Sequence, residues 1–592
     1  MNSQCATFLS AFLTMSSPLV IGVSGHRDPH PAALAQLRRH VEEFLADLRG
    51  RLPDTELRIM TGMAQGADLL VARAATQAGW KVDAILPMPL ERYIEDFDAE
   101  SAATLRELLA NPAVTCTILP APVGSDQDAP HGGGRSVFYA NLTQVLTAKC
   151  NLLLALWDGR NSRLEGGTAD TVLRYLGART HSGPDDSTIE FKPADAAAEA
   201  AWGPHFIYWV PTPRGDGAGV PNEPGYLTGI GENLLAAHGT QMPQPLTQQF
   251  TELNTYNREF ERLRGKHAFE QLDSLLPTLE LSDSVADREG LQRIDAEYGK
   301  ADALAVYYQR HSDRLFRGFS YTASFMALLF LIYAKLWANG VLLSVYLTIL
   351  LLSVLVFHRL RSHQWFSKHL VYRVLAETMR IKFFLRAAGA DRTVSATELI
   401  NLTGIDQFSG FSWIGNLLKN VEPLDQRSNG SAADRARLES VHRHWIVGQQ
   451  QYFQKRVHRL EREHHRLEVL KSGMLYAIAV FALVLLLFAI PLHERLIGAI
   501  TGHDGVMFLM GLLPVWLGIW ELYQNKMAMR ELLWQYRNQL GHFTIAALQL
   551  SRNTTADRSQ EILAQVGKEA LMESYLWTIH RYHREYEPPA AT

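Results

Sequence analysis

The chain has 592 residues, a length that predicts several domains rather than one. Lys and Arg total 57 while Asp and Glu total 61, so the formal net charge is −4. This near balance excludes the overall basic surface of a typical nucleic-acid-binding protein, and we expect no direct binding to nucleic acid. Only three cysteines occur, without CxxC spacing, which excludes a disulfide framework and predicts no zinc site.

The first 17 residues are weakly apolar, but no Lys or Arg precedes the apolar stretch. A secretory signal peptide begins with a positively charged region, so we do not expect one here. A strand-like segment, PLVIGVS, follows directly at residues 18–24. We therefore expect the N-terminal part of the chain to lie in the cytosol.

Short apolar segments alternate with helical patterns from residue 18 onward. The expected strands are 18–24, 56–62, 82–88, 115–121, 151–159 and 205–214, and the expected helices are 32–49, 67–78, 136–149 and 169–176. Continuous apolar strands that alternate with helices are typical of a parallel sheet covered on both faces. The sequence therefore predicts an α/β Rossmann-like domain with a parallel sheet over residues 18–215.

Three stretches interrupt or end this pattern. Residues 122–135 and 180–204 are polar or glycine-rich and are expected to form surface loops. Residues 215–245 are rich in Gly and Pro, which indicates an exit linker. We accordingly expect a linker and helical connector over residues 216–284.

The second half of the chain contains four apolar runs. A membrane span needs about 20 mostly apolar residues. The expected spans lie near 318–335, 339–357, 473–491 and 505–523. The alternative is a helical hairpin buried in a large soluble core. Few residues separate the members of each pair, so we expect an all-α membrane domain with one transmembrane hairpin in 285–390 and another in 434–592, joined by a cytosolic connector over 391–433.

Positive charges flank the outer ends of these hairpins. They are Arg310, Arg314, Arg317, Arg359, Arg361, Lys368, Lys471, Lys526 and Arg530. The turns inside the hairpins carry only Lys335 and Arg495. Because loops rich in Lys and Arg stay in the cytoplasm, both termini are predicted to be cytoplasmic. We expect a multi-pass protein of the inner (cell) membrane, with the lipid bilayer as a partner.

The approaches to the two hairpins are similar to each other. YYQRHSDRLFR at 307–317 resembles YFQKRVHRLER at 452–462, which suggests an internal duplication. Charged and apolar positions repeat periodically from about 434 to 470. This pattern predicts a single long helix, suited to a stalk or an oligomer contact.

Glycine-bearing turns fall at the carboxyl ends of expected strands, where open parallel sheets bind their ligands. The first turn is IGVSGHRD, in which Gly25 permits a tight turn and His26 and Arg27 are placed to face a phosphate or a sugar. The second turn is TGMAQGADLL, in which Gly62 and Gly66 bring the backbone close to a ligand.

Two further features extend this candidate ligand site. Asp68 follows the second turn and is available for a ribose hydroxyl, while the amides of the helix that starts there offer a site for an anion. The third turn, LWDGRNSRLEGGTADTV, places Asp158 after a strand and Gly166, Gly167 and Thr168 at the start of a helix. The alternative is that glycine at such junctions serves only to avoid steric clashes.

Several well-known motifs are absent. No GxxxxGK[ST] sequence occurs, which disfavours a P-loop ATPase, and the first turn lacks the GxGxxG fingerprint. The nucleophile elbow GxSxG is also missing.

The segments IGVSGHRD, GMAQGADLLVARAA, AILPMPLERYIEDF and LLALWDGR followed by GGTADTV resemble the SLOG superfamily in order and spacing. SLOG domains, named after the SMF/DprA and LOG proteins, are Rossmann-like. The resemblance covers about residues 18–215. It implies that this domain either processes nucleotides or senses them, including nucleotide second messengers in bacterial defence.

The membrane half is similar to the SLATT class of transmembrane effector domains. The supporting segments are HLVYRVLAETMRIKFFLRAAG, WIVGQQQYF and EALMESYLWTIHR. The LOG enzymes carry a PGGxGTxxE motif whose Glu takes part in ribosyl-bond cleavage, whereas this chain has EGGTADTV, with Thr171 in the place of that Glu. Asp170 is one position short and lies about 100° away around a helix, so it does not substitute. The resemblance therefore implies nucleotide binding without the LOG catalytic residue.

Together these features predict a membrane-bound sensor and effector. A nucleotide or nucleotide-derived second messenger is the expected ligand, and a four-span pore or membrane-disrupting domain is the expected output, in bacterial anti-phage defence. Four spans are few for a wide pore, so we expect a homo-oligomer. The alternatives are a membrane-tethered nucleotide-processing enzyme that hydrolyses an N-glycosidic bond, as LOG proteins do, and a membrane scaffold without a ligand.

Overall fold

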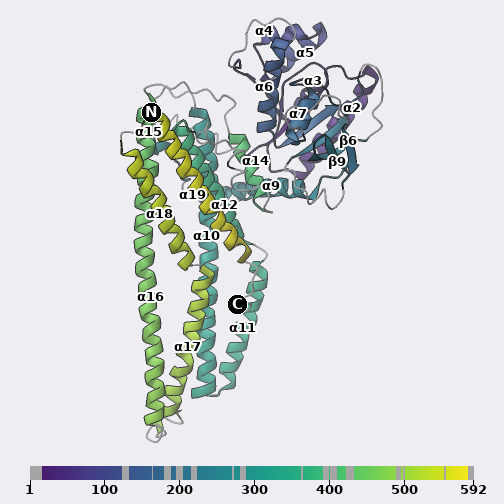
Figure 1. The fold of residues 1–592 in the computed structure, drawn as a ribbon. Helices are drawn as coiled ribbons and strands as arrows, with labels where there is room; N and C mark the ends of the chain where they lie inside the picture. Colours follow the sequence, from purple (N-terminus) through teal and green to yellow (C-terminus); the bar gives the residue numbers. More distant parts are fainter. Residues whose placement is uncertain are drawn as a thin grey trace. The chain divides into compact units, whose positions relative to one another are not determined.

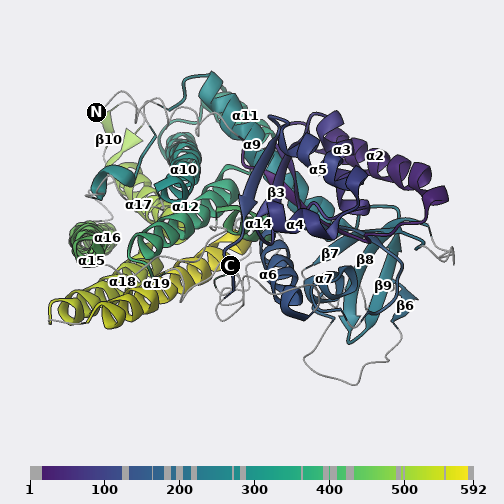
Figure 2. The same ribbon diagram turned by 90° about the horizontal axis from the view of Figure 1, so that it is seen from above.

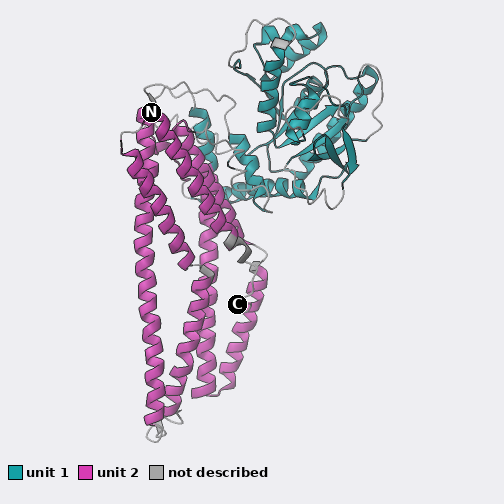
Figure 3. Cartoon of the chain, viewed as in Figure 1, with its two compact units in different colours: residues 1–270, 284–297, 391–430 teal, residues 271–283, 298–390, 431–592 magenta. Residues whose placement is uncertain are grey.

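The chain forms two compact units in the computed structural model (Figure 3). Unit 1 comprises residues 1–270, 284–297 and 391–430, and unit 2 comprises 271–283, 298–390 and 431–592. The structure describes residues 16–122, 133–162, 164–178, 189–194, 205–214, 223–269, 272–279, 288–361, 364–390, 399, 410–421, 433–488, 495–497, 500–527, 529–552 and 555–584. Most of the two expected loops, 122–135 and 180–204, and most of the connector 391–433 lie outside the described residues.

Unit 1 is built around a sheet of nine strands (Figure 1). They are β1 (Leu19–Gly25), β2 (Leu57–Thr61), β3 (Lys81–Leu86), β4 (Val114–Ile118), β5 (Leu152–Trp157), β6 (Glu190–Pro193), β7 (Phe206–Pro211), β8 (Gly225–Gly231) and β9 (Leu234–Gly239). Their order is β4-β3-β2-β1-β5-β7-β8-β9-β6. The strands from β4 to β7 in this order are parallel, and β1 and β5 are completely apolar or nearly so and buried.

Helices cover both faces of the parallel part of the sheet (Figure 2). One face carries α2 (Leu34–Arg51), α3 (Ala67–Gln77) and α5 (Ala99–Leu109), which connect β1 to β4 and pack against one another. The other face carries α6 (Gly133–Lys149) and α7 (Thr168–Tyr175). Right-handed crossovers explain this division, because the chain first moves from β1 to β4 and then returns to β5 and moves the other way. The order reverses between β1 and β5, which makes the gap between these strands a topological switch point.

The sheet is mixed and longer than the sequence suggests. The expected exit linker at 215–245 contains β8 and β9, and residues 215–222 lie outside the described residues. β8 is antiparallel to both β7 and β9, whereas β9 pairs with β6 in parallel. Two residues join β8 to β9, and Asn233 adopts the left-handed conformation with φ 52°. The predicted parallel sheet is confirmed from β4 to β7, but the expected linker contains a tight β-hairpin that its Gly-rich composition conceals.

Helix α5 has no counterpart in the sequence prediction. It begins after Asp98, whose carboxylate accepts a hydrogen bond from the Ser101 N–H at 2.7 Å. Asp is a strong N-cap residue, so this helix start carried a local signal that the apolar pattern did not reveal.

Three more helical segments belong to unit 1. They are α9 (Gln244–Gly265), α14 (Ser412–Val421) and the first turns of α10 (Arg288–Leu331), up to residue 297. Trp413 of α14 is buried against Tyr256 of α9, and their ring centroids are 5.2 Å apart. Glu297 of α10 accepts a hydrogen bond from Ser17 Oγ at 2.7 Å. Segments far apart in the sequence thus pack at the amino end of β1.

Unit 2 consists of helices in the part that the structure describes, apart from the short strands β10 (Arg495–Ile497) and β11 (Ile500–Thr501). The helices are the rest of α10, α11 (Gly340–Arg361), α12 (Trp365–Ala387), α15 (Ala433–Val441), α16 (Gly448–Leu487), α17 (Gly502–Met527), α18 (Met529–Leu550) and α19 (Ala556–Arg584). Four helical stretches are long and apolar enough to cross a membrane: Arg288–Leu336, Gly340–Arg359, Arg435–Leu487 and Gly502–Leu550.

The long helix expected at 434–470 differs from the observed one. A π-helical turn at His442–Val447 separates α15 from α16, and α16 continues to Leu487 through the third apolar run. The local pattern predicts helix correctly here, but the widened turn depends on packing. Trp445 in that turn is buried and stacks on Phe384 of α12, with ring centroids 5.4 Å apart.

Helix α10 runs antiparallel to α11, because Phe319 meets Phe357 while Phe330 meets Tyr346. It also runs antiparallel to α17, because Ser324 meets Trp516 while Leu331 meets Gly511. Trp516 Nε1 of α17 donates to the Ser324 carbonyl of α10 at 3.2 Å. The α10 and α11 helices meet through Phe319 and Phe357, whose ring centroids are 6.0 Å apart. Lys471 of α16 forms an ion pair with Glu521 of α17.

Candidate functional site

The carboxyl ends of β1 and β5 bring two predicted site residues together. His26 follows β1 and Asp158 follows β5, which pair in parallel. His26 Nε2 lies 3.0 Å from the Asp158 carboxylate and also 3.0 Å from the Asp158 backbone nitrogen. One ring nitrogen does not donate and accept at the same time. When Nε2 carries a proton it therefore donates to the Asp158 carboxylate, and when it carries none it accepts from the Asp158 N–H.

The Asp158 carboxyl is tuned to stay ionised. Its partial burial works against ionisation, but hydrogen bonds from the His26 ring and the Arg160 N–H outweigh this and lower the pKa of Asp158. Its side chain is 11 % exposed, so the carboxylate retains some access to solvent. This corner of the switch point therefore presents an anion beside an imidazole.

Arg27 lies in a cluster that the sequence prediction missed. Its guanidinium carbon is 4.9 Å from the ring centroid of Tyr139 on α6. Tyr139 donates to Asp96 at 2.5 Å, and Arg135 binds the same carboxylate at 2.6 Å. Burial lowers the pKa of Arg27, but its interactions with Tyr139, Tyr93 and Asp96 outweigh burial and raise this pKa, so Arg27 remains cationic.

The sequence contained partial signals for this cluster. Asp96 lies in the PLERYIEDF segment, and Arg135 and Tyr139 lie four residues apart, on one helix face. Arg135 ends the glycine-rich loop expected at 122–135, but it lies in α6. Only the tertiary fold brings α6 against the turn after β1.

Gly66 is required by a close contact with the first turn. Its φ is 87°, and a β-carbon at this position would lie 2.4 Å from the Arg27 carbonyl oxygen. The adjacent Ala67 N–H donates to the His26 carbonyl at 3.1 Å. The turn after β1 therefore rests on the start of α3, and Gly66 has a steric reason to be glycine.

Asp68 is used by the protein's own backbone. It is 4 % exposed, and its carboxylate accepts from the Gly25 N–H at 3.0 Å and from Thr61 Oγ1 at 2.9 Å. Burial raises its pKa to about 6, although these hydrogen bonds oppose the rise. The geometry therefore favours Asp68 as the residue that holds two turns together, and its contact with a ribose hydroxyl stays a prediction. Gly62 lies beside it, and its carbonyl accepts from Tyr93 at 2.9 Å.

The third turn reaches the same cluster. Gly166 has φ 78°, and a β-carbon there would lie 2.5 Å from the Tyr139 backbone. Gly167 precedes α7 and Thr168 begins it, and all three residues are partly exposed. Asp170 is fully buried and accepts from the Gly166 N–H at 2.9 Å. Tyr139 thus links two turns: its backbone lies against Gly166 of the third turn, and its ring lies against Arg27 of the first.

The predicted turns therefore form one contiguous site at the switch point. Its centre is a chain of contacts from Gly66 to Arg27, from Arg27 to Tyr139 and from Tyr139 to Gly166. His26 and Asp158 lie beside it. Both helix starts already hold a buried carboxylate, Asp68 in α3 and Asp170 in α7, which reduces their attraction for an anion. Arg27 is accordingly the principal cation that the site offers.

The described residues contain no group of three or more His, Cys, Asp or Glu side chains arranged to hold a metal ion. The chain matches no known protein-family model, and no curated protein matches it. The resemblance to SLOG and SLATT domains therefore stays a prediction, which the site geometry alone has to support.

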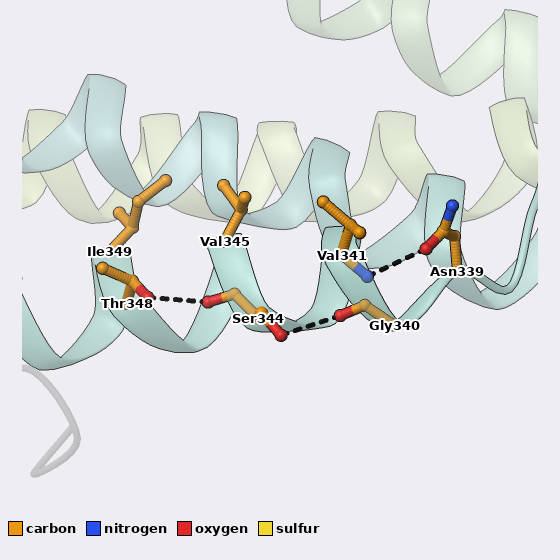
Figure 4. A pocket seen from close by; sticks show the side chains of 7 residues that line it. All are labelled: Asn339, Gly340, Val341, Ser344, Val345, Thr348 and Ile349. Carbon is orange, nitrogen blue, oxygen red and sulfur yellow. Dashed lines mark hydrogen bonds between the residues drawn. The ribbon is translucent and has the colours of Figure 1, made fainter.

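Unit 2 contains a hollow on α11 whose lining offers few groups that could bind or react with a ligand. It has a volume of about 570 Å³ and is lined by residues between Asn339 and Ile349 (Figure 4). Ser344 Oγ donates to the Gly340 carbonyl at 2.9 Å, and Thr348 Oγ1 donates to the Ser344 carbonyl at 2.8 Å. The helix backbone thus uses both hydroxyl protons, and no charged side chain lines the hollow.

Proposed function

We propose that this protein is a membrane-bound sensor and effector. In this proposal, the turns around Tyr139 in unit 1 bind a nucleotide-derived ligand, and unit 2 acts on the membrane in response. The observation that carries the proposal is the convergence of Arg27, His26 and Asp158 at the switch point of the sheet, where open α/β sheets bind ligands.

The chemistry of these side chains suits a nucleotide or a nucleotide-derived second messenger. Arg27 provides a cation for a phosphate, and its position on the Tyr139 ring holds it in place. Asp158 is an acceptor suited to a ribose hydroxyl or a base amine, and His26 either donates or accepts. The resemblance to SLOG domains points to the same class of ligand.

Sensing is favoured over hydrolysis by the surroundings of Thr171 and Asp170. Thr171 is 2 % exposed and its hydroxyl lies 2.9 Å from the Thr143 hydroxyl. Asp170 binds the Gly166 N–H and the Arg174 side chain at 2.8 Å, so it holds its own turn. Neither residue is placed as the acid of a LOG-type hydrolase, which leaves binding as the better-supported activity.

The membrane part of the proposal is a four-span domain of two hairpins in the inner membrane, with both termini in the cytoplasm. Its support is the antiparallel register of the apolar helices. Arg317 of α10 lies near Tyr523 of α17, and Lys471 pairs with Glu521, so these charges share one end of the bundle. That end is the cytoplasmic one by the positive-inside rule. Four spans enclose little space, so the proposed effector works as a homo-oligomer.

The first test is ligand binding by the full-length protein in detergent. Linear and cyclic nucleotides are screened for a rise in melting temperature, since stabilisation grows as RT ln(1 + [L]/Kd). Arg27→Ala should weaken binding about ten- to a hundredfold, because a charge-assisted hydrogen bond is lost. Arg106→Ala, which removes an exposed arginine of α5, is the matched control and should bind normally.

The second test asks whether the ligand acts on the membrane. The protein is reconstituted into vesicles, and ion leakage is measured with and without the nucleotide that raises its melting temperature. Leakage should change in the wild type and stay unchanged in Arg27→Ala. Nucleotide turnover without a change in leakage would favour the tethered enzyme, and the absence of any binding would favour a scaffold.

A further inference from the structure

A groove in unit 2 runs between the apolar helices α10 and α11. Its volume is about 380 Å³, within the roughly 300–1,000 Å³ of small-molecule sites. The α10 wall includes Arg314, Gly318, Phe319 and Thr322, and the α11 wall includes Leu352 and Val356. Leu352 is 55 % exposed and Val356 is 45 % exposed, so this apolar wall is open.

The hydroxyl groups in the groove do not make it polar. Thr322 Oγ1 donates to the Gly318 carbonyl at 2.9 Å, and Ser353 Oγ donates to the Ile349 carbonyl at 2.7 Å. Because the helix backbone takes these protons, the groove presents mainly carbon atoms. A ligand segment that lies there has to be apolar.

The end of the groove toward the amino end of α10 is cationic. Arg314 lines it, and Arg310 lies one turn earlier on the same helix face. Among the described residues, neither guanidinium has a hydrogen-bond or ion-pair partner, and both side chains are exposed. The nearest acid along the chain, Asp313, is attracted to Arg317 and Arg581. The positive charge of Arg310 and Arg314 is therefore left for another anion.

We propose that this groove binds one anionic phospholipid, with an acyl chain along the apolar wall and the phosphate at Arg314 and Arg310. A free phosphate would leave the apolar wall uncovered, and a neutral lipid would leave both arginines without a counter-charge. The inference rests on the proposed insertion of α10 and α11 in a membrane. The acyl chain covers the open apolar wall that Leu352 and Val356 form beside the contact between Phe319 and Phe357.

The test uses the full-length protein in detergent, with bound phosphatidylglycerol counted by native mass spectrometry. Arg314→Gln should weaken phosphatidylglycerol binding about fivefold, the contribution of one basic residue at an anionic lipid surface. Gly318→Leu should abolish phosphatidylglycerol binding in the groove. Gly318 lines the groove and a β-carbon there meets no atom within 4 Å, so the added side chain occupies the space of the acyl chain. Gly473→Leu on α16, which also meets no atom, and Arg262→Gln on α9 are the matched controls and should bind as the wild type does.

Phosphatidylcholine and inorganic phosphate serve as competitors that separate the two parts of the ligand. Neither should displace phosphatidylglycerol from the wild type. Equal binding of phosphatidylglycerol by the wild type, Arg314→Gln and Gly318→Leu would overturn the proposal, and so would equal affinity for phosphatidylcholine. Flotation of the protein with vesicles tests membrane insertion separately: insertion without lipid selectivity contradicts only this inference, whereas failure to insert contradicts the proposed function.

Discussion

At the scale of single residues, the candidate site depends on glycines that let three turns touch. Gly66 lies against the backbone of Arg27, and Gly166 lies against the backbone of Tyr139. A packing role for these glycines does not conflict with a ligand role, because the same contacts place Arg27 at the switch point. The buried Asp68 adds to this, since it ties Gly25 to Thr61.

Gly66→Ala should destabilise unit 1 more than replacing a glycine that has a positive φ but no close neighbour. Gly79 is the matched control, because its φ is 76° but a β-carbon there meets nothing within 4 Å. Strain alone costs about 1–2 kcal/mol, and displacement of the Arg27 backbone adds about 1–3 kcal/mol. We expect Gly66→Ala to lower the melting temperature about twice as much as Gly79→Ala. Equal decreases would contradict the close contact.

At the scale of elements, the interface between α18 and α19 contains an acid that is hard to ionise. Glu573 of α19 has a side chain that is 14 % exposed, and burial raises its pKa to about 7. His542 of α18 lies 3.9 Å from it and is closer to Glu569, at 2.7 Å. The histidine therefore interacts mainly with Glu569.

The raised pKa of Glu573 predicts a dependence of stability on pH. The folded protein keeps this proton up to about pH 7, whereas the unfolded chain releases it near pH 4.5. Stability should therefore fall as the pH rises from about 4.5 to about 7. Glu573→Gln should raise the melting temperature at pH 8 and reduce this decline, whereas Glu561→Gln, at an exposed position of α19, should do neither. A decline of the same size in Glu573→Gln would show that another group causes it.

At the scale of the whole molecule, the division into two compact units does not follow the order of segments along the chain. Residues 391–430 lie between the two expected hairpins, yet they belong to unit 1 with the α/β sheet. Asn420 in α14 donates to the Pro18 carbonyl at 2.6 Å, across 402 positions of sequence. This long-range contact joins the segment that follows the first two apolar helices to the start of the sheet.

The topology itself makes a direct prediction. A reporter that is active only in the cytoplasm should work when it is fused at Thr592 or inserted near Asn429, and should be silent near Asn339. The physical reason is the clustering of Lys and Arg outside the hairpins. Fluorescence or enzymatic activity of each fusion in intact cells provides the measurement. Activity near Asn339 together with silence near Asn429 would reverse the orientation.

The sequence by itself determined the features that depend on local pattern. Apolar runs and helical periodicity located β1, β2, β3, β4, β5 and β7 within one to three residues at most ends, and they located the four apolar helices. They also located the glycine turns at strand ends, because a strand, the turn after it and the next helix are contiguous in the chain, so local sequence is enough to recognise them.

Only the tertiary structure decided the features that depend on distant residues. The sheet continues into β8 and β9 because the edge of β7 accepts an antiparallel strand, a pairing that composition does not reveal. Tyr139 and Asp96 join the site because α6 packs beside the turn after β1. Asp68 serves the backbone because folding buries its carboxylate between two N-terminal strands. The free energy of each feature comes from contacts between segments that are far apart in the chain, and local sequence does not specify which of those segments meet.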